Sequence, residues 1–573
     1  MLLTVGRSAT PHHRAKGGAL PHPPLSTGFT RSALGPTVAS VHDTGQQSRP
    51  VAQRTISGAK RRRSLVGDEH SPDHVAVVAN REPYSHQRLE DGRIVVARPP
   101  SGLVTGIEPL LRECGGTWIA AATGSADREC SDRDGRLRVP TETREYTLQR
   151  LWFDPELYER YYSGLSNEGL WPLCHTAHIR PSFRAADWAA YQSINDSFAR
   201  AAVRETTRNG LVLVQDYHFA LVPRLIRHRA PHAVTNLFWH IPWPNAEVFG
   251  IFPWKNELLE GMLGADVVGF HTRQYCLNFL DSAQRYLECR VDLEKMSISF
   301  RGHQTLVRAY PISVEWPYPS ASRAQGRELR QSLGIPDDVH VSVGVDRADY
   351  TKGLIERVAA IELMLEQNAA LRGRYVHVQL ASPTRMHIRK YQELASDLEE
   401  AVARVNERFG TAGWAPVLLH MRAFSPEEVR KHYAMADSAL VTPLHDGMNL
   451  VAKEYVASCS DGDGALVLST FAGAAKELES ALLVNPYDSQ ETAAAILRAI
   501  RMPRQERCAR MQAMRDQVAT HSIHDWSAKI LHDLRAVRDQ ARRVRPVQPL
   551  AGAAVSRFDT HESASFLAEE AAS

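Results

Sequence analysis

The segment VTPLHDGMNLVAKEY, residues 441–455, joins a predicted strand to a predicted helix through a short polar loop. An apolar run ends at its start, the loop contains His445, Asp446 and Gly447, and the helix carries Glu454. This order places the N–H groups at the start of the helix at the carboxyl edge of a parallel sheet, where α/β proteins bind ligands. Such N–H groups and the positive end of the helix dipole attract phosphate. The segment therefore predicts a site for an anionic ligand in an α/β fold.

The composition is that of a globular protein with two domains. A chain of 573 residues exceeds what one hydrophobic core usually supports, and 43% hydrophobic and 23% charged residues are ordinary for a soluble protein. The net charge of +3 gives no argument for a nucleic-acid partner, and no apolar run is long enough to cross a membrane. Seven scattered cysteines without a CxxC pair predict neither a disulfide framework nor a zinc site. We therefore expect a cytoplasmic protein without membrane or nucleic-acid partners, and leave open whether it forms a homo-oligomer.

Short apolar runs alternate with segments of helical spacing along most of the chain. This alternation predicts parallel sheets with helices on both faces. The strands are predicted at 74–79, 211–214, 235–239, 265–269 and 305–310 in a first series, and at 339–345, 375–381, 417–421, 438–442 and 465–469 in a second.

The predicted fold class is α/β, with two doubly wound Rossmann-like domains that face a cleft. Residues 1–73 are basic and rich in Pro, Gly, Ser and Arg, and we expect a disordered extension; a transit peptide would share this composition, and a dispensable extension is favoured over it. Residues 74–325 are predicted to form the N-terminal Rossmann-like domain and residues 326–525 the C-terminal one. A helix over 526–545 crosses back to the first domain, and 546–573 is a loose tail.

A second motif, GVDRADYTKG at 344–353, also follows an apolar strand and opens a helix. Arg347 and Lys352 then emerge at the carboxyl edge of the sheet. An arginine forks onto two oxygens and a lysine adds a compact charge, which suits a diphosphate. On spacing alone two surface cations are the commoner reading, but their predicted place beside Asp446 favours a diphosphate site.

These two motifs resemble the donor-site signatures of the trehalose-6-phosphate synthase family, which are retaining glycosyltransferases of family 20 with the GT-B fold. The resemblance extends over about residues 74–545 and keeps the family's motif order. It implies that Arg347 and Lys352 hold the diphosphate of the donor and that Asp446 binds hydroxyls of the transferred glucose. It further implies that the backbone at Asn449, Leu450 and Val451 meets the diphosphate and that Glu454 binds the ribose.

Two motifs of the first domain extend the match. The run QDYH at 215–218 implies a sugar-binding Asp216, and HIPWP at 240–244 implies a glucose-contacting His240. Gln215 stands where the family usually has histidine. The family's Gly-Gly-Leu is Ser101-Gly102-Leu103 here, which leaves Gly102 as the donor-binding glycine.

The acceptor is expected at the edge of the first domain. By resemblance, NREPY at 80–84 supplies Arg81, YYSGLSNEGLWP at 161–172 supplies Tyr162 and Trp171 as walls, and Arg385 reaches over from the second domain. Asp216 belongs to the acceptor side as well. Together Arg81 and Arg385 would grip the phosphate of a sugar phosphate.

The resemblance implies a retaining α,α-trehalose-phosphate synthase that moves glucose from a nucleoside diphosphate glucose, expected to be UDP-glucose, to glucose 6-phosphate. The nucleotide sugar is a substrate, so no cofactor and no metal are expected, and Asp216, His240, Arg347, Lys352 and Asp446 are the candidate catalytic residues. The donor base stays open among uridine, adenosine and guanosine. Alternatives are a glucosylglycerol-phosphate or pseudo-disaccharide synthase of the same family, and a catalytically silent sugar-phosphate sensor or scaffold.

Overall fold

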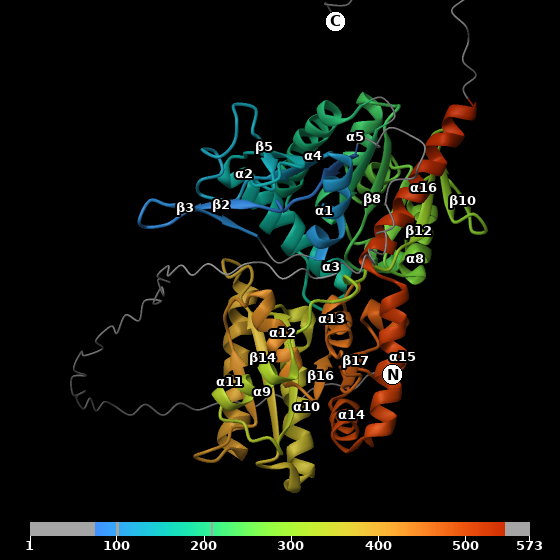
Figure 1. The fold of residues 1–573 in the computed structure, drawn as a ribbon. Helices are drawn as coiled ribbons and strands as arrows, with labels where there is room; N and C mark the ends of the chain where they lie inside the picture. The colour runs from blue at the N-terminus through green and yellow to red at the C-terminus, as the bar shows by residue number, and fades with distance from the viewer. Residues whose placement is uncertain (1–74, 99–101, 208–209, 545–573) are drawn as a thin grey trace, which may run out of the picture. The chain divides into compact units, whose positions relative to one another are not determined.

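A computed structural model of the chain describes residues 75–98, 102–207 and 210–544 (Figure 1). The predictions for 1–73 and 546–573 lie outside these residues. Among the described helices, none is long and apolar enough to cross a membrane.

The first sheet has ten strands and is mostly parallel. Its strands are β1 (Val75–Val78), β4 (Thr117–Ala121), β5 (Arg136–Val139), β6 (Tyr146–Leu151), β7 (Leu211–Gln215), β8 (Val234–Phe238), β9 (Val267–Phe270), β10 (Arg290–Asp292), β11 (Ser297–Phe300) and β12 (His303–Ala309). The order is β10-β11-β12-β9-β8-β7-β1-β4-β6-β5, with antiparallel pairing only at the two edges. On one side of β1 the sheet continues with β4 and β6, and on the other side it continues with β7, β8 and β9. The point of reversal therefore lies between β1 and β7, which is where doubly wound sheets bind ligands.

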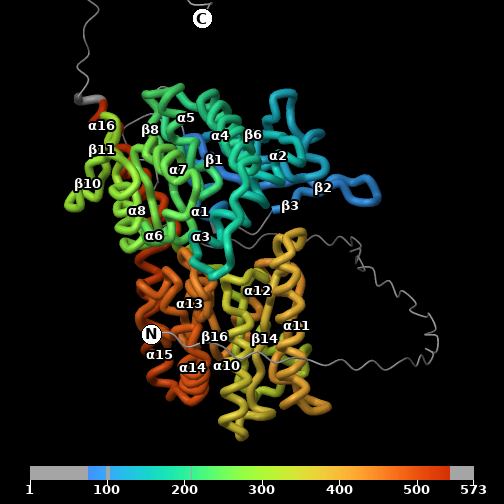
Figure 2. Tube along the Cα trace, turned by 180° about the vertical axis from the view of Figure 1, so that it is seen from behind, coloured from blue at the N-terminus to red at the C-terminus, as the bar shows by residue number. Residues whose placement is uncertain are grey.

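Helices cover both faces of this sheet because its strands are apolar on both sides. In β1, Val75 and Val77 pack toward α1 and α16, and Ala76 and Val78 pack into the cluster that contains α4, α5, α7 and α8. Figures 1 and 2 show these two helical layers from opposite sides. The helices are α1 (Gly102–Cys114), α4 (Ala185–Glu205), α5 (Val222–Arg229), α7 (Lys255–Met262), α8 (Arg273–Tyr286) and α16 (Ile523–Val544).

The second sheet has six strands, all parallel. Its strands are β13 (His340–Arg347), β14 (Tyr375–Ser382), β15 (Val417–His420), β16 (Ser438–Val441), β17 (Ala465–Ser469) and β18 (Leu482–Val484). The order β15-β14-β13-β16-β17-β18 again reverses beside its first strand, between β13 and β16. A second ligand-binding edge is thus expected where these two strands end.

Helices also cover both faces of the second sheet. On α10, Leu354, Val358, Ile361 and Leu365 are all buried and follow the spacing of a single helical stripe, which explains why this segment packs as an amphipathic helix. The helices around this sheet are α9 (Arg323–Ser332), α10 (Leu354–Gln367), α11 (Arg389–Phe409), α12 (Pro426–Met435), α13 (Leu450–Ser458), α14 (Ser489–Arg501) and α15 (Arg504–Thr520).

The two doubly wound sheets confirm the predicted fold class, and each of the ten predicted strands overlaps a strand of the structure. The strands β4, β5, β6, β10, β11 and β18 were not predicted, and neither were two further features. A separate hairpin is formed by β2 (Ser85–Arg88) and β3 (Ile94–Ala97). A π-helix over Arg160–Leu170 connects α2 (Pro155–Glu159) to α3 (Trp171–His175), and π-helical turns are frequent at functional sites.

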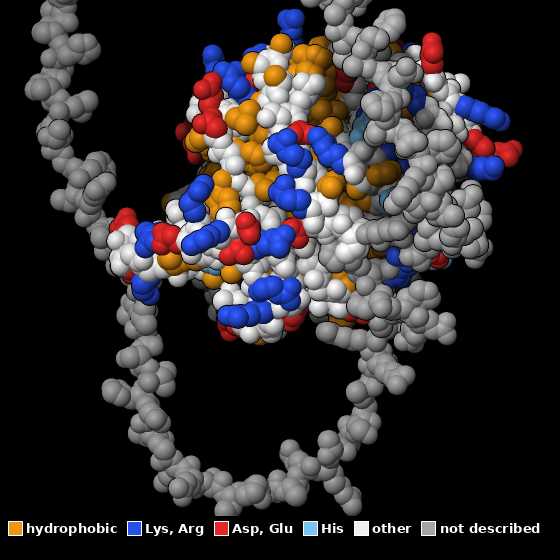
Figure 3. Space-filling view, turned by 90° about the horizontal axis from the view of Figure 1, so that it is seen from above, with side chains coloured by type: hydrophobic (Ala, Val, Ile, Leu, Met, Phe, Trp, Pro, Cys, Tyr) orange, Lys and Arg blue, Asp and Glu red, His pale blue; other side chains and the backbone are white. Residues whose placement is uncertain are grey.

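On the face shown in Figure 3, Lys and Arg side chains are interspersed with acidic and apolar ones. This mixture agrees with the small net charge of +3.

Candidate functional site

A cavity of about 680 Å³ is lined by residues that follow the strands at both reversal points. Arg81 follows β1 and Asp216 follows β7, while Arg347 ends β13 and Asp446 follows β16. Thirteen of the fourteen predicted site residues line this cavity: Arg81, Tyr162, Trp171, Asp216, His240, Arg347, Lys352, Arg385, Asp446, Asn449, Leu450, Val451 and Glu454. The fourteenth, Gly102, is the first residue of α1, and the cavity is lined there by the next residues, Leu103 to Thr105.

At the second sheet, Asp446 is held by Lys352 from the other motif and by Asn449 from its own. Nζ of Lys352 lies 2.5 Å from Oδ2 of Asp446, and Nδ2 of Asn449 donates to the same oxygen at 3.1 Å. Burial acts to raise the pKa of Asp446, but the Lys352 ammonium more than offsets this, and the pKa falls below its usual value. Asp446 is therefore an ionised carboxylate, which can only accept hydrogen bonds and so suits sugar hydroxyls.

Asn449 is the N-cap of α13, with φ of +70°, and its side chain accepts from the N–H of Ala452. The N–H groups of Leu450 and Val451 belong to the first turn and have no partner within the helix. Both residues line the cavity. The start of this helix can therefore bind an anionic group.

Gly447 explains how closely the two sheets' loops approach each other. A Cβ atom at this position would lie 2.2 Å from the carbonyl oxygen of His240, a distance that no real Cβ contact adopts. Glycine is thus required for the Asp446 loop to lie against the loop that follows β8.

A buried carboxylate, Asp349, interacts with both Arg347 and Arg385. Its Oδ2 lies 3.2 Å from Nη1 of Arg385 and 4.0 Å from Nη2 of Arg347. Burial acts to raise the pKa of Asp349, but Arg347, Arg385 and Lys352 lower it to about 2. The sequence analysis did not single out Asp349, although it lies two residues after Arg347 in the same motif.

Both guanidinium groups also lie over the indole of Trp171. The Cζ atoms of Arg385 and Arg347 are 4.3 and 5.2 Å from its ring centroid. Arginine stacks readily on aromatic faces, so Trp171 fixes the planes of both groups.

The phenol of Tyr162 lies close to several positive charges in the cavity. Burial acts to raise the pKa of its phenol, yet Arg385, Arg81 and Arg347 together lower it below the ordinary value. Three guanidinium groups therefore converge on one part of the cavity. Such a cluster matches the charge and oxygen geometry of a phosphate group.

Asp216 and His240 lie side by side at the end of the first sheet. Asp216, with φ of +78°, accepts from the N–H of Tyr217 at 2.9 Å and from the N–H of His240 at 3.2 Å. Burial raises its pKa to about 6, although these hydrogen bonds and Arg385 act to lower it. Asp216 is thus ionised at neutral pH and ready to accept from a hydroxyl.

His240 is held by the residue that departs from the family pattern. Its Nε2 lies 3.0 Å from Oε1 of Gln215, which is 1% exposed. Burial, with His271 and His218 nearby, lowers the pKa of His240 well below its usual value. The imidazole is therefore neutral, and Gln215 fixes its tautomer by accepting the Nε2–H.

Several lining residues were missed by the sequence analysis. His218 stacks on Tyr162, with 5.7 Å between the ring centroids. Its two ring nitrogens are buried and have no hydrogen-bond partner in the described part of the chain. At the other end, Tyr433 Oη donates to Glu454 Oε2 at 3.0 Å, and burial raises the pKa of Glu454. The cavity continues past Glu454 along Tyr318, Phe424 and Arg430. Only the position of His218, two residues after Asp216, could have suggested any of these.

Within the described residues, no group of three or more His, Cys, Asp or Glu side chains is arranged to hold a metal ion.

Comparisons with known proteins agree on one family. The profile described as Glycosyltransferase family 20 matches residues 73–536. The trehalose-6-phosphate synthase of Mycolicibacterium smegmatis is 39% identical over 474 residues, which cover 80% of this chain and 92% of that protein. A structure from E. coli, described as trehalose-6-phosphate bound with UDP-2-fluoro glucose, has a TM-score of 0.72 at 31% identity and covers 81% of this chain and 99% of its own. An α,α-trehalose-phosphate synthase (UDP-forming) from Burkholderia xenovorans, in complex with glucose-6-phosphate, has a TM-score of 0.71 at 30% identity, with 81% and 100% covered.

Proposed function

Because the chain belongs to glycosyltransferase family 20, we propose that it transfers glucose from UDP-glucose to glucose 6-phosphate and releases α,α-trehalose 6-phosphate with retention of configuration. The observation that carries this proposal is a single cavity with two anion-binding ends. At one end, Arg347 and Lys352 line the cavity together with the start of α13. At the other end, Arg81 and Arg385 lie near Tyr162. As part of the proposal we place the enzyme in the cytoplasm, in line with its scattered, odd number of cysteines.

On the donor side, the diphosphate lies between the two cations and the N–H groups of Leu450 and Val451. Asp446 then accepts from hydroxyls of the transferred glucose, and Glu454 accepts from the ribose. Glu454 is positioned for this by the hydroxyl of Tyr433.

The difficult step is departure of the diphosphate, since negative charge grows on the β-phosphate oxygen as its bond to the anomeric carbon breaks. Fixed cations and helix N–H groups aimed at that oxygen stabilise the transition state and need no reorganisation. Retention follows from attack on the same face of the sugar, with the leaving phosphate accepting the acceptor's proton. No side chain is assigned as a nucleophile.

On the acceptor side, the phosphate of glucose 6-phosphate pairs with Arg81 and Arg385, while Tyr162 and Trp171 flank the sugar ring. Asp216 accepts from an acceptor hydroxyl, and Nδ1 of the neutral His240 accepts from a hydroxyl of the transferred glucose. Burial of both sugars in one cavity excludes water, which would otherwise hydrolyse the donor.

The experiment is an activity matrix on the purified full chain. UDP-, ADP- and GDP-glucose are each combined with glucose 6-phosphate and with glycerol 3-phosphate. The proposal expects the highest kcat/KM for UDP-glucose with glucose 6-phosphate. A preference for glycerol 3-phosphate would replace it by glucosylglycerol-phosphate synthesis, and binding of sugar phosphate without turnover of any donor would indicate a silent sensor.

A further inference from the structure

The loop that carries Arg81 is held from beneath by a buried ionic cluster outside the cavity. Arg81 itself is exposed, whereas the next residue, Glu82, is only 2% exposed. The Glu82 carboxylate accepts from Nε of Arg150 at 2.8 Å, and from the N–H and hydroxyl of Thr123 at 3.1 and 2.9 Å. Neither Glu82 nor Arg150 lines the cavity. The side chain after Arg81 is thus an anchor within the protein.

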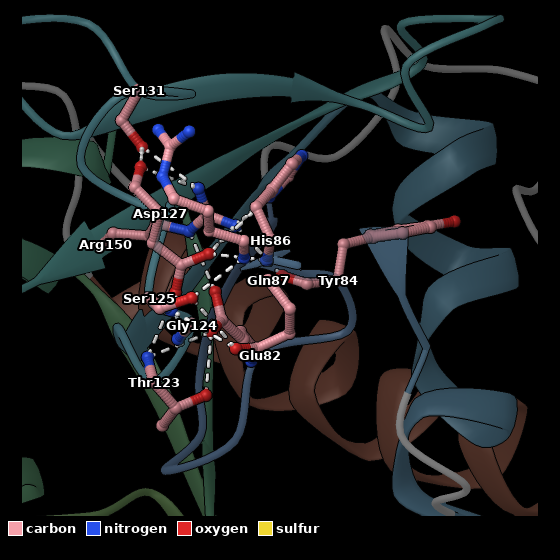
Figure 4. Close-up of polar contacts among 11 residues, drawn as sticks. Glu82, Tyr84, His86, Gln87, Thr123, Gly124, Ser125, Asp127, Ser131 and Arg150 are labelled. Atoms are coloured by element: carbon pink, nitrogen blue, oxygen red, sulfur yellow. Dashed lines mark hydrogen bonds and ion pairs between the residues drawn. The ribbon is translucent and has the colours of Figure 1, made fainter. Parts of the chain in front are cut away.

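Arg150, on β6, is 1% exposed and contacts several residues of the segment that follows Arg81. Beyond Glu82, its Nη2 donates to the carbonyl oxygen of Tyr84 at 3.0 Å and lies 2.8 Å from Nδ1 of His86. Because a guanidinium can only donate, His86 Nδ1 must be the acceptor. One side chain therefore fixes three alternate residues of the segment that leads from Arg81 into β2, as Figure 4 shows.

Asp127 completes the cluster on the far side of Arg150. Its Oδ1 lies 2.9 Å from Nη2 of Arg150 and accepts from the N–H of His86 at 2.7 Å, and its Oδ2 accepts from the N–H of Gly124 at 2.6 Å. In Figure 4 the side chains of Glu82, Asp127 and Arg150 point toward one another. The loop over 123–127 and the Arg81 loop are thereby joined through one guanidinium.

The main chain of Arg81 is also held from the other direction. Nε1 of Trp118, a fully buried residue of β4, donates to the carbonyl oxygen of Arg81 at 3.1 Å. The peptide at Arg81 is thus fixed on one side by Trp118 and on the other by Glu82. The Arg81 side chain is not part of this cluster and instead lines the cavity.

Stability alone does not account for this arrangement. Removing two carboxyls and a guanidinium from water carries a large desolvation penalty, and well-packed apolar side chains are often as stabilising as a buried ion pair. What an ionic cluster adds is directional hydrogen bonding that sets the main chain to one geometry. That property matters where a charged side chain must meet a phosphate from an exposed loop.

We propose that Glu82 and Arg150 are positioning residues for glucose 6-phosphate binding, which act by fixing the main chain of Arg81. The inference rests on the proposed function, since it takes Arg81 as the contact to the acceptor phosphate. Neither residue touches the substrate. Their effect must therefore pass through Arg81 and disappear when the Arg81 side chain is removed.

The experiment is a double-mutant cycle on the full chain. The kinetics are measured at pH 8, where Glu82→Gln keeps the size and the Thr123 hydrogen bond but removes the charge that meets Arg150. We expect kcat/KM for glucose 6-phosphate, at saturating UDP-glucose, to fall ~10-fold, a change of about 1.4 kcal/mol, with KM for UDP-glucose unchanged. In an Arg81→Ala background the same Glu82→Gln change should alter kcat/KM less than ~2-fold, because coupled residues are not additive. Arg150→Lys should resemble Glu82→Gln.

Arg227→Met is the matched control, because Arg227 pairs with the buried Asp266 at 2.8 Å in the same domain and does not line the cavity. It should lower Tm and leave kcat/KM for glucose 6-phosphate unchanged. An equal loss from Glu82→Gln with and without Arg81, or no loss in the wild-type background, would overturn the inference. If Arg81→Ala alone left kcat/KM for glucose 6-phosphate unchanged, the acceptor site of the proposed function would fail instead, which is a separate outcome.

Discussion

Lys352 and Asp446 form an ion pair of 2.5 Å that joins the loops after β13 and β16 at the reversal point of the second sheet. The two residues are 94 positions apart in sequence and belong to different motifs. Under the proposed function, this contact assembles the cation for the diphosphate and the carboxylate for the glucose as one unit before a donor binds.

Asp446→Asn should lower kcat/KM for UDP-glucose by ~10²–10³, because a preorganised charged contact is lost and the Lys352 ammonium is left without its counterion. Steady-state kinetics with varied UDP-glucose would measure this. Glu477→Gln provides the control, since it removes the partner of another buried lysine, Lys453, at 2.6 Å, outside the cavity. A loss of similar size in Glu477→Gln would show that the effect is general destabilisation.

Gln215→Leu should reduce kcat/KM for the donor ~10-fold, because the Nε2–H of His240 would lose its acceptor and the imidazole its fixed tautomer. An unsatisfied buried donor costs about 1–3 kcal/mol. Gln215→His introduces the residue usual in the family and should retain more activity than Gln215→Leu. Equal activity of the two variants would contradict the role given to Gln215.

Gly447→Ala should abolish most activity, by at least ~100-fold in kcat/KM, because displacement of a catalytic loop by about 1 Å has effects of that order. The added Cβ would lie 2.2 Å from the carbonyl oxygen of His240. Because this oxygen belongs to the main chain, the contact can be relieved only if one of the two loops moves. Gly413→Ala is the matched control, because a Cβ at Gly413 has no atom within 4 Å. Full activity of Gly447→Ala would mean that the two loops need not lie this close.

The Glu82 cluster predicts a specific pH dependence of stability. Burial and the hydrogen bond to Asp127 raise the pKa of Glu82 to about 7 from an ordinary 4.5, although Arg150 acts to lower it. A raised folded-state pKa contributes stability that is fully present below pH 4.5 and is lost as the pH rises through 7. The shift corresponds to about 3 kcal/mol. The charged or titratable groups that act on Glu82 are Arg150 and Asp127, and Tyr158 lies close enough to interact with it.

Thermal unfolding of wild type and Glu82→Gln at pH 5 and pH 8 would test this dependence. The glutamine cannot titrate, so wild type should lose more Tm than the variant between these two pH values. Parallel pH profiles of the two proteins would contradict the assignment. Other groups that titrate in this window, such as Asp216, are common to both proteins and cancel in the difference.

The strands that sequence reasoning found are those with continuous apolar runs, as expected for parallel strands buried on both faces. The run at 211–214 became β7 and the run at 438–442 became β16. In contrast, β6 reads YTLQRL, and its Gln149 and Arg150 argue against a buried strand. Arg150 is buried because it meets Glu82 and Asp127, which lie 68 and 23 residues away, and Gln149 donates to the carbonyl oxygen of Asp134, 15 residues away; no local pattern reveals these partners.

The same distinction applies to the candidate site, where local motifs reveal some residues and tertiary packing positions the others. Residues carried by motifs, such as Arg347 and Asp446, line the cavity as predicted. Asp349, His218 and Gln215 act through partners brought together by tertiary packing, and their types alone indicate only a capping acid or a core polar group. The π-helix over Arg160–Leu170 was likewise invisible, because its glycines and serines are typical of a loop.

The most direct test of the central claim is identification of the product formed by the full chain from UDP-glucose and glucose 6-phosphate. Proton NMR of the purified product is predicted to show two α-configured anomeric positions in a 1,1 linkage, with one phosphorylated glucose, which defines α,α-trehalose 6-phosphate formed with retention. A β-configured linkage, or release of free glucose from UDP-glucose without a disaccharide phosphate, would contradict the account.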